Sequence, residues 1–240
     1  MINKDFKRRR DLLLSKIEDS SIVVLFSGLE KSRNNDVNYK FRQSSNFFYL
    51  TGINNPSVLL IITKTSNRHS TTLVCDRPND IDKIWHGQLP SKSSYKNQFE
   101  IQNVLYFDEL RSLELNDARN IYFEFADENR LNEFISNLNL SQPQSRYLRN
   151  NTSRSTKIDL SNLIFDMRRI KSKSEVSLIR HAAKISAKAH INIMKSCKSG
   201  LKEYEVEADF IKHCMSERCE QAYPATVSYT HLRAHETATY

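Results

Sequence analysis

Near the C-terminus, two histidines and a glutamate have a spacing that could bind a metal ion. His231 and His235 are four residues apart, and Glu236 follows the second histidine. On a helix, side chains four residues apart lie on one face, so two imidazoles can share a metal. The zinc-peptidase order H-E-x-x-H is not met, because Leu232 stands where the glutamate belongs. Whether this motif binds a metal therefore depends on what the preceding residues predict for this part of the chain.

The composition excludes some classes of partner. The chain has 240 residues and a net charge of +8, and a charge of this size can indicate nucleic-acid binding. The basic residues are dispersed, however, and we interpret the densest run, Lys7–Arg10, as the solvated face of an N-terminal helix. The longest aliphatic run, Val58–Ile62, is far shorter than the roughly 20 residues that span a bilayer. We therefore expect neither a nucleic-acid partner nor a membrane partner.

The cysteine pattern predicts reduced thiols. Cys75, Cys197, Cys214 and Cys219 form no C-x-x-C pair, and the N-terminus has no signal-peptide pattern. Reduced thiols are typical of cytoplasmic proteins. We expect a soluble protein in the cytoplasm.

The first 150 residues alternate between strand-like and helix-like stretches, which predicts an α/β domain with a mixed central sheet flanked by helices. The strand-like stretches are short, rich in β-branched or aromatic residues, and several are apolar on both faces, as in a covered sheet. The predicted strands are residues 21–26, 58–63, 71–75, 104–107 and 121–125, and the predicted helices are residues 5–18, 79–86 and 127–138.

Beyond this region the periodicity changes. Residues 141–157 are polar and basic, which predicts a surface loop or linker. Apolar residues then recur every three or four positions from Leu178 to Ile193, which predicts one long helix. Ser172 and Glu175 form a capping box at its start, and we expect Gly200 to cap its end. A second helix is predicted to carry Val206, Phe210 and Cys214 on one side and to end near Arg218.

The stretch from Tyr39 to Lys64 is the most informative part of the sequence. Its aromatic residues 47–50 predict a short strand, and residues 52–56 predict a turn into the next strand. The stretch resembles the N-terminal domain of aminopeptidase P, the Xaa-Pro aminopeptidase family. Four further segments are similar to that family in the right order, so that the resemblance extends from residue 6 to about residue 227: residues 6–14, 82–89, 167–190 and 222–227.

The resemblance implies a metal-dependent peptidase. Its catalytic half has the α+β pita-bread fold shared with prolidase and methionine aminopeptidase. Two divalent metal ions, usually Mn²⁺, hold a hydroxide that attacks the scissile carbonyl of peptides with proline at the second position. Two aspartates, one histidine and two glutamates bind the metals, and oxygen ligands of this kind suit manganese. The full-length family enzyme is expected to be a homo-oligomer.

The resemblance also implies that the metal ligands are missing, since in the family they lie downstream of the segment matched by residues 222–227. We therefore expect a truncated product without peptidase activity, with no catalytic and no metal-binding residue. The four glycines, none of which lies after position 200, agree with this. The expected organisation is an N-terminal domain (1–157, linker about 141–165), the start of a pita-bread domain (166–227) and a non-native tail (228–240). The histidine motif at 231–236 falls in that tail, for which the alternatives are an unstructured native end and a metal site.

Two residues are candidates for substrate binding. The resemblance implies that Trp85, the only tryptophan, lines the substrate cleft, in some relatives that of a neighbouring subunit. The alternative is a tryptophan that fixes a helix to the sheet. Asp36 matches an acidic position that approaches the cleft, where it would guide the substrate's ammonium group. The alternative for Asp36 is a turn-forming aspartate.

Two other functions stay open. Prolidase, which cuts Xaa-Pro dipeptides, shares the catalytic fold, although residues 41–52 look closer to aminopeptidase P. A non-catalytic pita-bread-type module that binds peptides or proteins is the alternative from a different class, and the basic charge is compatible with it.

Overall fold

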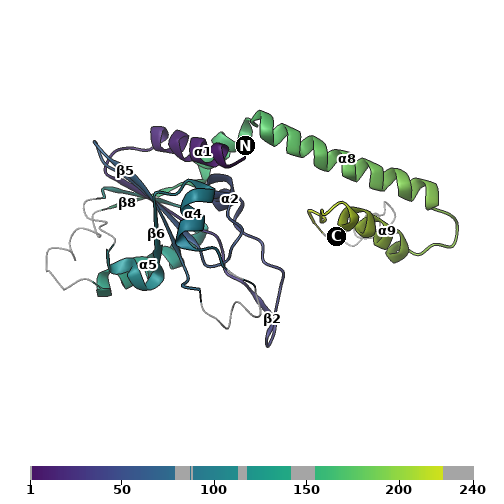
Figure 1. The fold of residues 1–240 in the computed structure, drawn as a ribbon, viewed down its shortest axis with the longest axis horizontal. Helices are drawn as coiled ribbons and strands as arrows, with labels where there is room; N and C mark the ends of the chain where they lie inside the picture. The colour runs from purple at the N-terminus through teal and green to yellow at the C-terminus, as the bar shows by residue number, and fades with distance from the viewer. Residues whose placement is uncertain (1, 79–86, 88, 113–117, 142–154, 224–240) are drawn as a thin grey trace, which may run out of the picture. The chain divides into compact units, whose positions relative to one another are not determined.

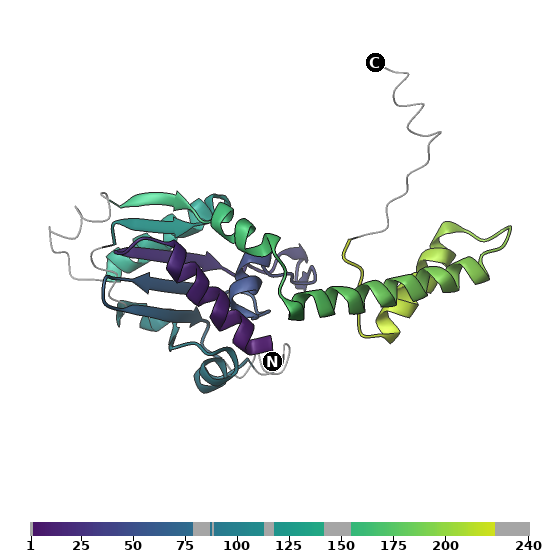
Figure 2. The ribbon, with the colours of Figure 1, turned by 90° about the horizontal axis from the view of Figure 1, so that it is seen from above.

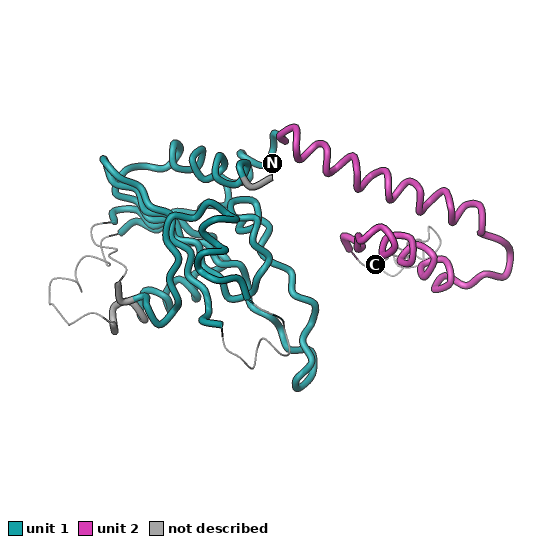
Figure 3. Tube along the Cα trace, viewed as in Figure 1, with its two compact units in different colours: residues 1–170 teal, residues 171–240 magenta. Residues whose placement is uncertain are grey.

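The computed structural model describes residues 2–78, 87, 89–112, 118–141 and 155–223 (Figure 1). These residues form two compact units, residues 1–170 and residues 171–240, each described here by itself (Figure 3). The predicted helix 79–86, Trp85 and the histidine motif lie outside the described residues.

The described part of unit 1 contains one six-stranded sheet with the order β6-β5-β4-β1-β7-β8. Strand β4 runs antiparallel to β1 and β5, whereas the pairs β1–β7, β7–β8 and β5–β6 are parallel. The sheet is therefore mixed, as predicted. Its strands are β1 (Ser21–Phe26), β4 (Leu59–Lys64), β5 (His69–Cys75), β6 (Asn103–Tyr106), β7 (Asn120–Phe123) and β8 (Thr156–Asp159).

Helices cover both faces of the sheet. One face packs against α1 (Ile2–Lys16), α2 (Ser45–Thr51), α4 (Lys92–Phe99) and α7 (Ser161–Arg169). Figure 2 shows α1 and α7 lying across it. The other face packs against α5 (Glu128–Ser141) and the 3₁₀ helix η1 (Phe107–Ser112), while a second 3₁₀ helix, η2 (Phe125–Asp127), leads into α5. Every residue of the central strand β1 is buried, because its side chains alternate between these two cores.

The five predicted strands are confirmed with shifts of one or two residues at their ends. The predicted helices 5–18 and 127–138 correspond to α1 and α5. The structure adds elements that were not predicted, namely α4, α7, β8 and a small hairpin of β2 (Ser32–Asn34) and β3 (Val37–Asn38). Strand β8 and the first half of helix α7 lie within the range expected to be a linker, because Ile158, Leu160 and Ile164 give this polar region an apolar side that packs on the sheet.

The prediction of an aromatic strand at residues 47–50 was wrong, since these residues belong to helix α2. The oxygen of Ser44 caps the helix by accepting from the Phe47 amide at 3.4 Å. Gly52 ends it with a left-handed φ of 73°, and its amide donates to the Phe48 carbonyl. The β preference of aromatic residues reflects packing on a half-buried surface, and here the two caps and burial against the sheet favour the helix.

The interpretation of Lys7–Arg10 as a solvated run holds for Lys7 and Arg8, which are exposed, but was wrong for its second half. Arg9 and Arg10 are 8% and 2% exposed. The Arg9 guanidinium donates to the Tyr49 carbonyl at 3.0 Å and lies 4.2 Å from the centre of the Tyr49 ring. Arginines that are buried in this way bind backbone carbonyls instead of water.

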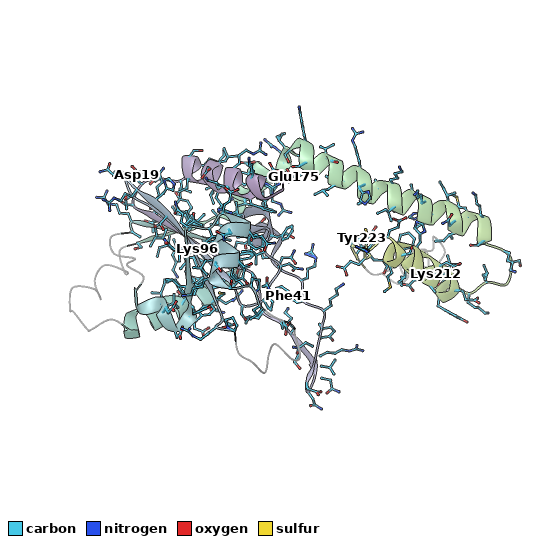
Figure 4. All side chains as sticks on the ribbon, viewed as in Figure 1. Asp19, Phe41, Lys96, Glu175, Lys212 and Tyr223 are labelled. Carbon is cyan, nitrogen blue, oxygen red and sulfur yellow. The ribbon has the colours of Figure 1, made fainter. Side chains whose placement is uncertain are left out.

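The described part of unit 2, residues 171–223, contains two helices, α8 (Lys173–Ser196) and α9 (Glu203–Ser216), which pack through Ile185, Ala189 and Cys214. The capping box of Ser172 and Glu175 is confirmed, and Figure 4 labels Glu175 at the start of α8. The expected cap at Gly200 was wrong. The helix is capped by Cys197 in an extended conformation, because the Ile193 carbonyl already accepts the Cys197 amide. No helix in the described ranges is long and apolar enough to cross a bilayer.

Candidate functional site

Five strands of unit 1 end at the same edge of the sheet, which we call the carboxyl edge. Because β4 alone runs the other way, β1, β5, β6, β7 and β8 all have their C-terminal ends there. In open α/β sheets, ligands bind beyond the carboxyl ends of strands. The connection after β1 carries Asp36, and the connection after β5 carries Trp85. The two predicted site residues thus belong to connections that leave the same edge.

The connection after β1 is an exposed hairpin, residues 29–42, which we call the hairpin arm (Figure 1). Asp36 lies in the turn between β2 and β3 and is exposed. Asn35, beside it, has a left-handed φ of 47°, a conformation that asparagine tolerates. The arm places the Asp36 carboxylate in solvent, at the tip of a projecting element.

The base of the hairpin arm is fixed to the sheet by Ser27, which is fully buried. Its amide donates to the Val58 carbonyl at 2.8 Å, and its hydroxyl accepts from the Val58 amide at 2.9 Å. Its carbonyl accepts from the Ser44 amide at 2.7 Å. The ring of Phe41, labelled in Figure 4, lies beside Gly28. The two ends of the arm are therefore held together by Ser27, at the carboxyl end of β1, and Ser44, which caps α2.

The charges of the hairpin arm are mainly basic. Glu30 and Asp36 are its two acids, and its four basic residues are Lys31, Arg33, Lys40 and Arg42. Asn38 donates to the Glu30 carboxylate at 2.8 Å. The field around the arm is thus net positive, and any attraction of an ammonium group to Asp36 acts only at short range.

Arg77 lies before the connection that carries Trp85, and Lys92 lies after it. Both belong to one group of side chains that we call the Tyr106 cluster. Its five members are Arg77, Lys92, Tyr106, Asp108 and Glu109. Arg77 donates to Asp108 at 2.8 Å and to Glu109 at 3.4 Å, and Lys92 donates to the other oxygen of Glu109.

A partly buried polar network lies where β7 ends. Glu124 accepts from the Asn46 side-chain amide at 2.6 Å and from the Ser44 hydroxyl at 3.3 Å. The oxygen of Asn46 accepts from Arg168 at 2.6 Å. The network joins β7, α2 and α7, so it holds the helices that cover this end of the sheet.

Burial raises the pKa of Glu124 above its ordinary value, and the charges of Asp127 and Asp159 raise it further. Hydrogen bonds from Asn46 and Ser44 act in the opposite direction. A raised pKa means that the folded chain holds the proton more tightly than the unfolded chain does. The contribution of Glu124 to stability is therefore fully present at acid pH and is lost as the pH rises through its raised pKa.

We expect Glu124→Gln to stabilise the protein progressively, relative to wild type, as the pH rises from 4 to 8. Glutamine keeps an acceptor for Asn46 but carries no charge to desolvate. Urea unfolding of both proteins at several pH values measures the difference, in which groups common to both cancel. The matched control is Glu128→Gln, at an exposed glutamate that pairs with Lys157 at 2.7 Å. A difference for Glu124→Gln that is flat or falls with pH would contradict this account.

The described residues do not fit the expected two-metal centre. No three His, Cys, Asp or Glu side chains among them lie together so as to hold a metal ion. The described groups at the carboxyl edge can bind charged or aromatic parts of a ligand and can position connections.

The sequence did not indicate the polar groups that only the fold brings together. Asn46 and Arg168 lie in segments that carried the family resemblance, yet nothing in their spacing indicated a shared contact 122 residues apart. For Glu124 there was a signal, because a single acid interrupts the apolar run of residues 121–125. A charge in such a run predicts either the end of a strand or a paired buried group.

Comparison with known families identifies the larger part of unit 1. Residues 6–122 match the model of the family described as "Aminopeptidase P, N-terminal domain". The match begins in α1 and ends in β7, so it spans the hairpin arm, the Tyr106 cluster and five of the six strands described above.

Curated relatives include two kinds of peptidase. An Xaa-Pro aminopeptidase of Escherichia coli (strain K12) is 28% identical over 225 residues, which cover 92% of this chain and 51% of that protein. An Xaa-Pro dipeptidase of Homo sapiens is 29% identical over 201 residues, which cover 83% of this chain and 39% of that protein. The chain thus spans about half the length, or less, of these relatives.

Solved structures share the fold. Proline aminopeptidase P II from Yersinia pestis superposes with a TM-score of 0.78 at 27% identity, covering 90% of this chain and 50% of that one. Aminopeptidase P from Escherichia coli with the inhibitor Pro-Leu superposes with a TM-score of 0.81 at 25% identity, covering 90% and 49%.

Proposed function

Because this chain carries the N-terminal domain of the aminopeptidase P family over residues 6–122, we propose that the whole protein is an Xaa-Pro aminopeptidase. It removes the N-terminal residue that precedes proline in a peptide. The observation that carries the proposal is the family match, supported by similarity to Xaa-Pro peptidases over nine tenths of the chain. The proposal places the catalytic centre outside the described residues.

The proposal includes a metal because of the bond to be cut. An Xaa-Pro bond is a tertiary amide whose nitrogen carries no hydrogen, and a metal-bound hydroxide is the nucleophile that we propose for its carbonyl. Family members are metallopeptidases, and Mn²⁺ is the metal that we propose for the whole protein. A cytoplasmic location and a homo-oligomeric state complete the proposal. The four free cysteines are compatible with that location.

Asp36 and Trp85 are the residues that we propose to bind the substrate. The fold supports this pair because the two connections that carry these residues leave the same carboxyl edge of the sheet. The exposed Asp36 carboxylate is suited to the N-terminal ammonium group of a peptide. An aromatic side chain such as that of Trp85 is suited to a proline ring.

We expect Asp36→Asn and Trp85→Ala each to lower kcat/KM of the whole protein on an Xaa-Pro-Yaa peptide by roughly tenfold, the value of one exposed charge-assisted or aromatic contact. The matched control is Glu30→Gln, which removes the same charge from the same hairpin arm. If all three variants cleave at the wild-type rate, both substrate-binding assignments fall. An equal loss in Asp36→Asn and Glu30→Gln would mean a general field effect and no specific contact.

The alternative is prolidase, and the observation that favours it is the human Xaa-Pro dipeptidase, which is 29% identical to this chain where the Escherichia coli Xaa-Pro aminopeptidase is 28% identical. Assays of the whole protein with an Xaa-Pro dipeptide and an Xaa-Pro-Yaa tripeptide separate the two. We expect cleavage of the tripeptide. Cleavage of the dipeptide alone would identify a prolidase, and binding without cleavage of either would identify a binding module.

A further inference from the structure

The hairpin arm projects from the body of unit 1 (Figure 1), and its side chains are divided between two faces. Ser32 lies opposite Asn38 in the register of β2 with β3. The Asn38 side-chain amide donates to the Glu30 carboxylate at 2.8 Å, so these three polar residues lie on one face. Because successive side chains of a strand point to opposite faces, the residues between them lie on the other face.

The other face of the arm is apolar and basic. Val37 and Tyr39 are two residues apart on the same side of the hairpin and are 54% and 59% exposed. Lys31 lies opposite Tyr39, whose amide donates to the Lys31 carbonyl at 2.9 Å. We call Lys31, Val37 and Tyr39 together the Tyr39 face. It presents an aromatic ring, a branched aliphatic side chain and a cation to solvent.

The charges of the arm favour an acidic ligand. Within the described part of the chain, the side chains of Lys31 and Arg33 form no ion pair. With four basic and two acidic residues, the arm has a net charge of +2. An exposed element of one sign attracts ligands of the opposite sign and repels a second copy of itself. An acidic ligand therefore suits the arm better than the arm of another molecule does.

The arm also offers backbone groups to an extended chain. Strands β2 and β3 form a two-stranded sheet, which no other strand in the described ranges joins. An extended peptide can pair with such an open edge, where main-chain hydrogen bonds provide affinity and side chains provide selectivity. An extended acidic peptide is thus the ligand that fits both the edges and the charges of the arm.

The position of Asp36 determines which part of a peptide would meet the Tyr39 face. Asp36 lies in the turn, three residues before Tyr39. Three residues of extended chain cover about 10 Å. A peptide whose ammonium group lies at Asp36 would therefore place its third or fourth residue beside Tyr39 and Lys31, beyond the proline.

We propose that the hairpin arm selects Xaa-Pro peptides that have an acidic residue in the third or fourth position. Lys31 and Arg33 bind the carboxylates, and Tyr39 contacts the peptide beside them. The substrate role rests on the proposed function, in which Asp36 binds the ammonium group. The charge and the two faces of the arm stand on the contacts above.

Peptide binding to the full chain tests the arm without catalysis. Two peptides of equal length that differ in charge, Ala-Pro-Glu-Glu and Ala-Pro-Gln-Gln, are titrated into the isotope-labelled chain and followed by NMR. We expect the amide resonances of Lys31, Val37 and Tyr39 to shift with the acidic peptide well before they shift with the neutral one. The difference should shrink as salt is added, because exposed charges are screened. Equal shifts with both peptides, or shifts only elsewhere in the chain, would overturn the arm as a site for acidic peptides.

Kinetics of the whole protein test the selectivity. We expect kcat/KM for Ala-Pro-Glu-Glu to exceed that for Ala-Pro-Gln-Gln by roughly three- to tenfold at low salt, the range for two exposed ion pairs. The double variant Lys31→Gln, Arg33→Gln is expected to bring this ratio close to one, whereas Lys31→Arg, which keeps the charge, is expected to retain it.

The matched control is the double variant Lys16→Gln, Arg68→Gln. Both residues are exposed. Lys16 ends α1 ahead of β1, and Arg68 lies between β4 and β5, so both lie at the edge of the sheet opposite the carboxyl edge. This control removes one lysine and one arginine, as the arm variant does, and is expected to keep the ratio. An equal loss of the ratio in both double variants would mean that the net charge of +8 attracts acidic peptides in general, and would refute selection by the arm.

The two measurements fail in distinguishable ways. A wild-type ratio near one, with both peptides cleaved, would refute the substrate selectivity and leave the proposed function intact. If the whole protein cleaves no Xaa-Pro peptide at all, the proposed function fails and the substrate role of the arm fails with it. The NMR titration still decides in that case whether the arm binds acidic peptides.

Discussion

Replacement of Arg10 by methionine is expected to lower the free energy of unfolding of unit 1 by about 3–4 kcal/mol. The guanidinium of Arg10 donates to the carbonyls of Leu50 (2.9 Å), Phe99 (3.0 Å) and Glu100 (2.9 Å). It thereby joins the ends of α2 and α4 to α1. Methionine fills similar space but leaves these three carbonyls without that donor.

Amide hydrogen exchange in β1 and β4 measures the loss, because the slowest exchanging amides of a unit report its global stability. Burial lowers the pKa of Arg10 to about 10, so the side chain is still charged at neutral pH.

The control is Arg8→Met on the same helix. Arg8 pairs only with Asp5 in the contacts described, at 3.2 Å, and its side chain is 64% exposed. We expect Arg8→Met to lower the free energy of unfolding by about 0.5 kcal/mol or less. Equal losses in the two variants would refute a special role for Arg10.

Replacement of Gly52 by alanine is expected to lower the free energy of unfolding of unit 1 by about 2–4 kcal/mol. Gly52 has a left-handed φ of 73°, which an L-residue adopts at a cost. A β-carbon at this position would also lie 2.2 Å from Cε2 of the Phe6 ring. Phe6 is buried and packs edge-on against Phe48, with ring centres 6.0 Å apart, so it cannot move without disturbing the contact between α1 and α2.

A cycle with Phe6→Val separates the steric clash from the backbone strain. Valine has no atoms beyond the γ position, so the clash disappears while the φ of residue 52 stays the same. We expect Gly52→Ala to cost only about 1–2 kcal/mol in the Phe6→Val background. The same hydrogen-exchange measurement applies. If the cost is equal in both backgrounds, the close approach of Phe6 plays no part.

Five of the six sheet strands described in unit 1 could be predicted because their signal is local. Ser21–Phe26 is apolar at every position after the first and is bounded by polar residues, and the structure buries all six residues under helices on both faces. The long helix of unit 2 was predicted for the same reason, since its apolar period and its Ser172–Glu175 capping box lie within the helix itself. The family match could likewise be anticipated from short ordered segments.

The candidate site was predictable only in part. The two connections that carry Asp36 and Trp85 could be named from the sequence, but their departure from one edge follows from strand order and direction, which put β5 parallel to β1 across the antiparallel β4. The Tyr106 cluster is a similar case. Arg77 and Lys92 are ordinary basic residues in the sequence, and only the pairing of β5 with β6 brings both to Glu109.

Alternating and periodic apolar residues, caps and turn signals determined which segments of this protein are strands and helices, because those preferences arise within a few residues of chain. The tertiary structure alone decided the roles of individual polar side chains. Arg10 was read as solvated because its neighbours are basic, yet its three acceptors lie 40 to 90 residues away. The aromatic segment 47–50 has local caps at Ser44 and Gly52, but its burial in the core of unit 1 depends on distant segments and favours the helix over the predicted strand. Contacts of this kind depend on the packing of distant segments, whose free energy no local pattern carries.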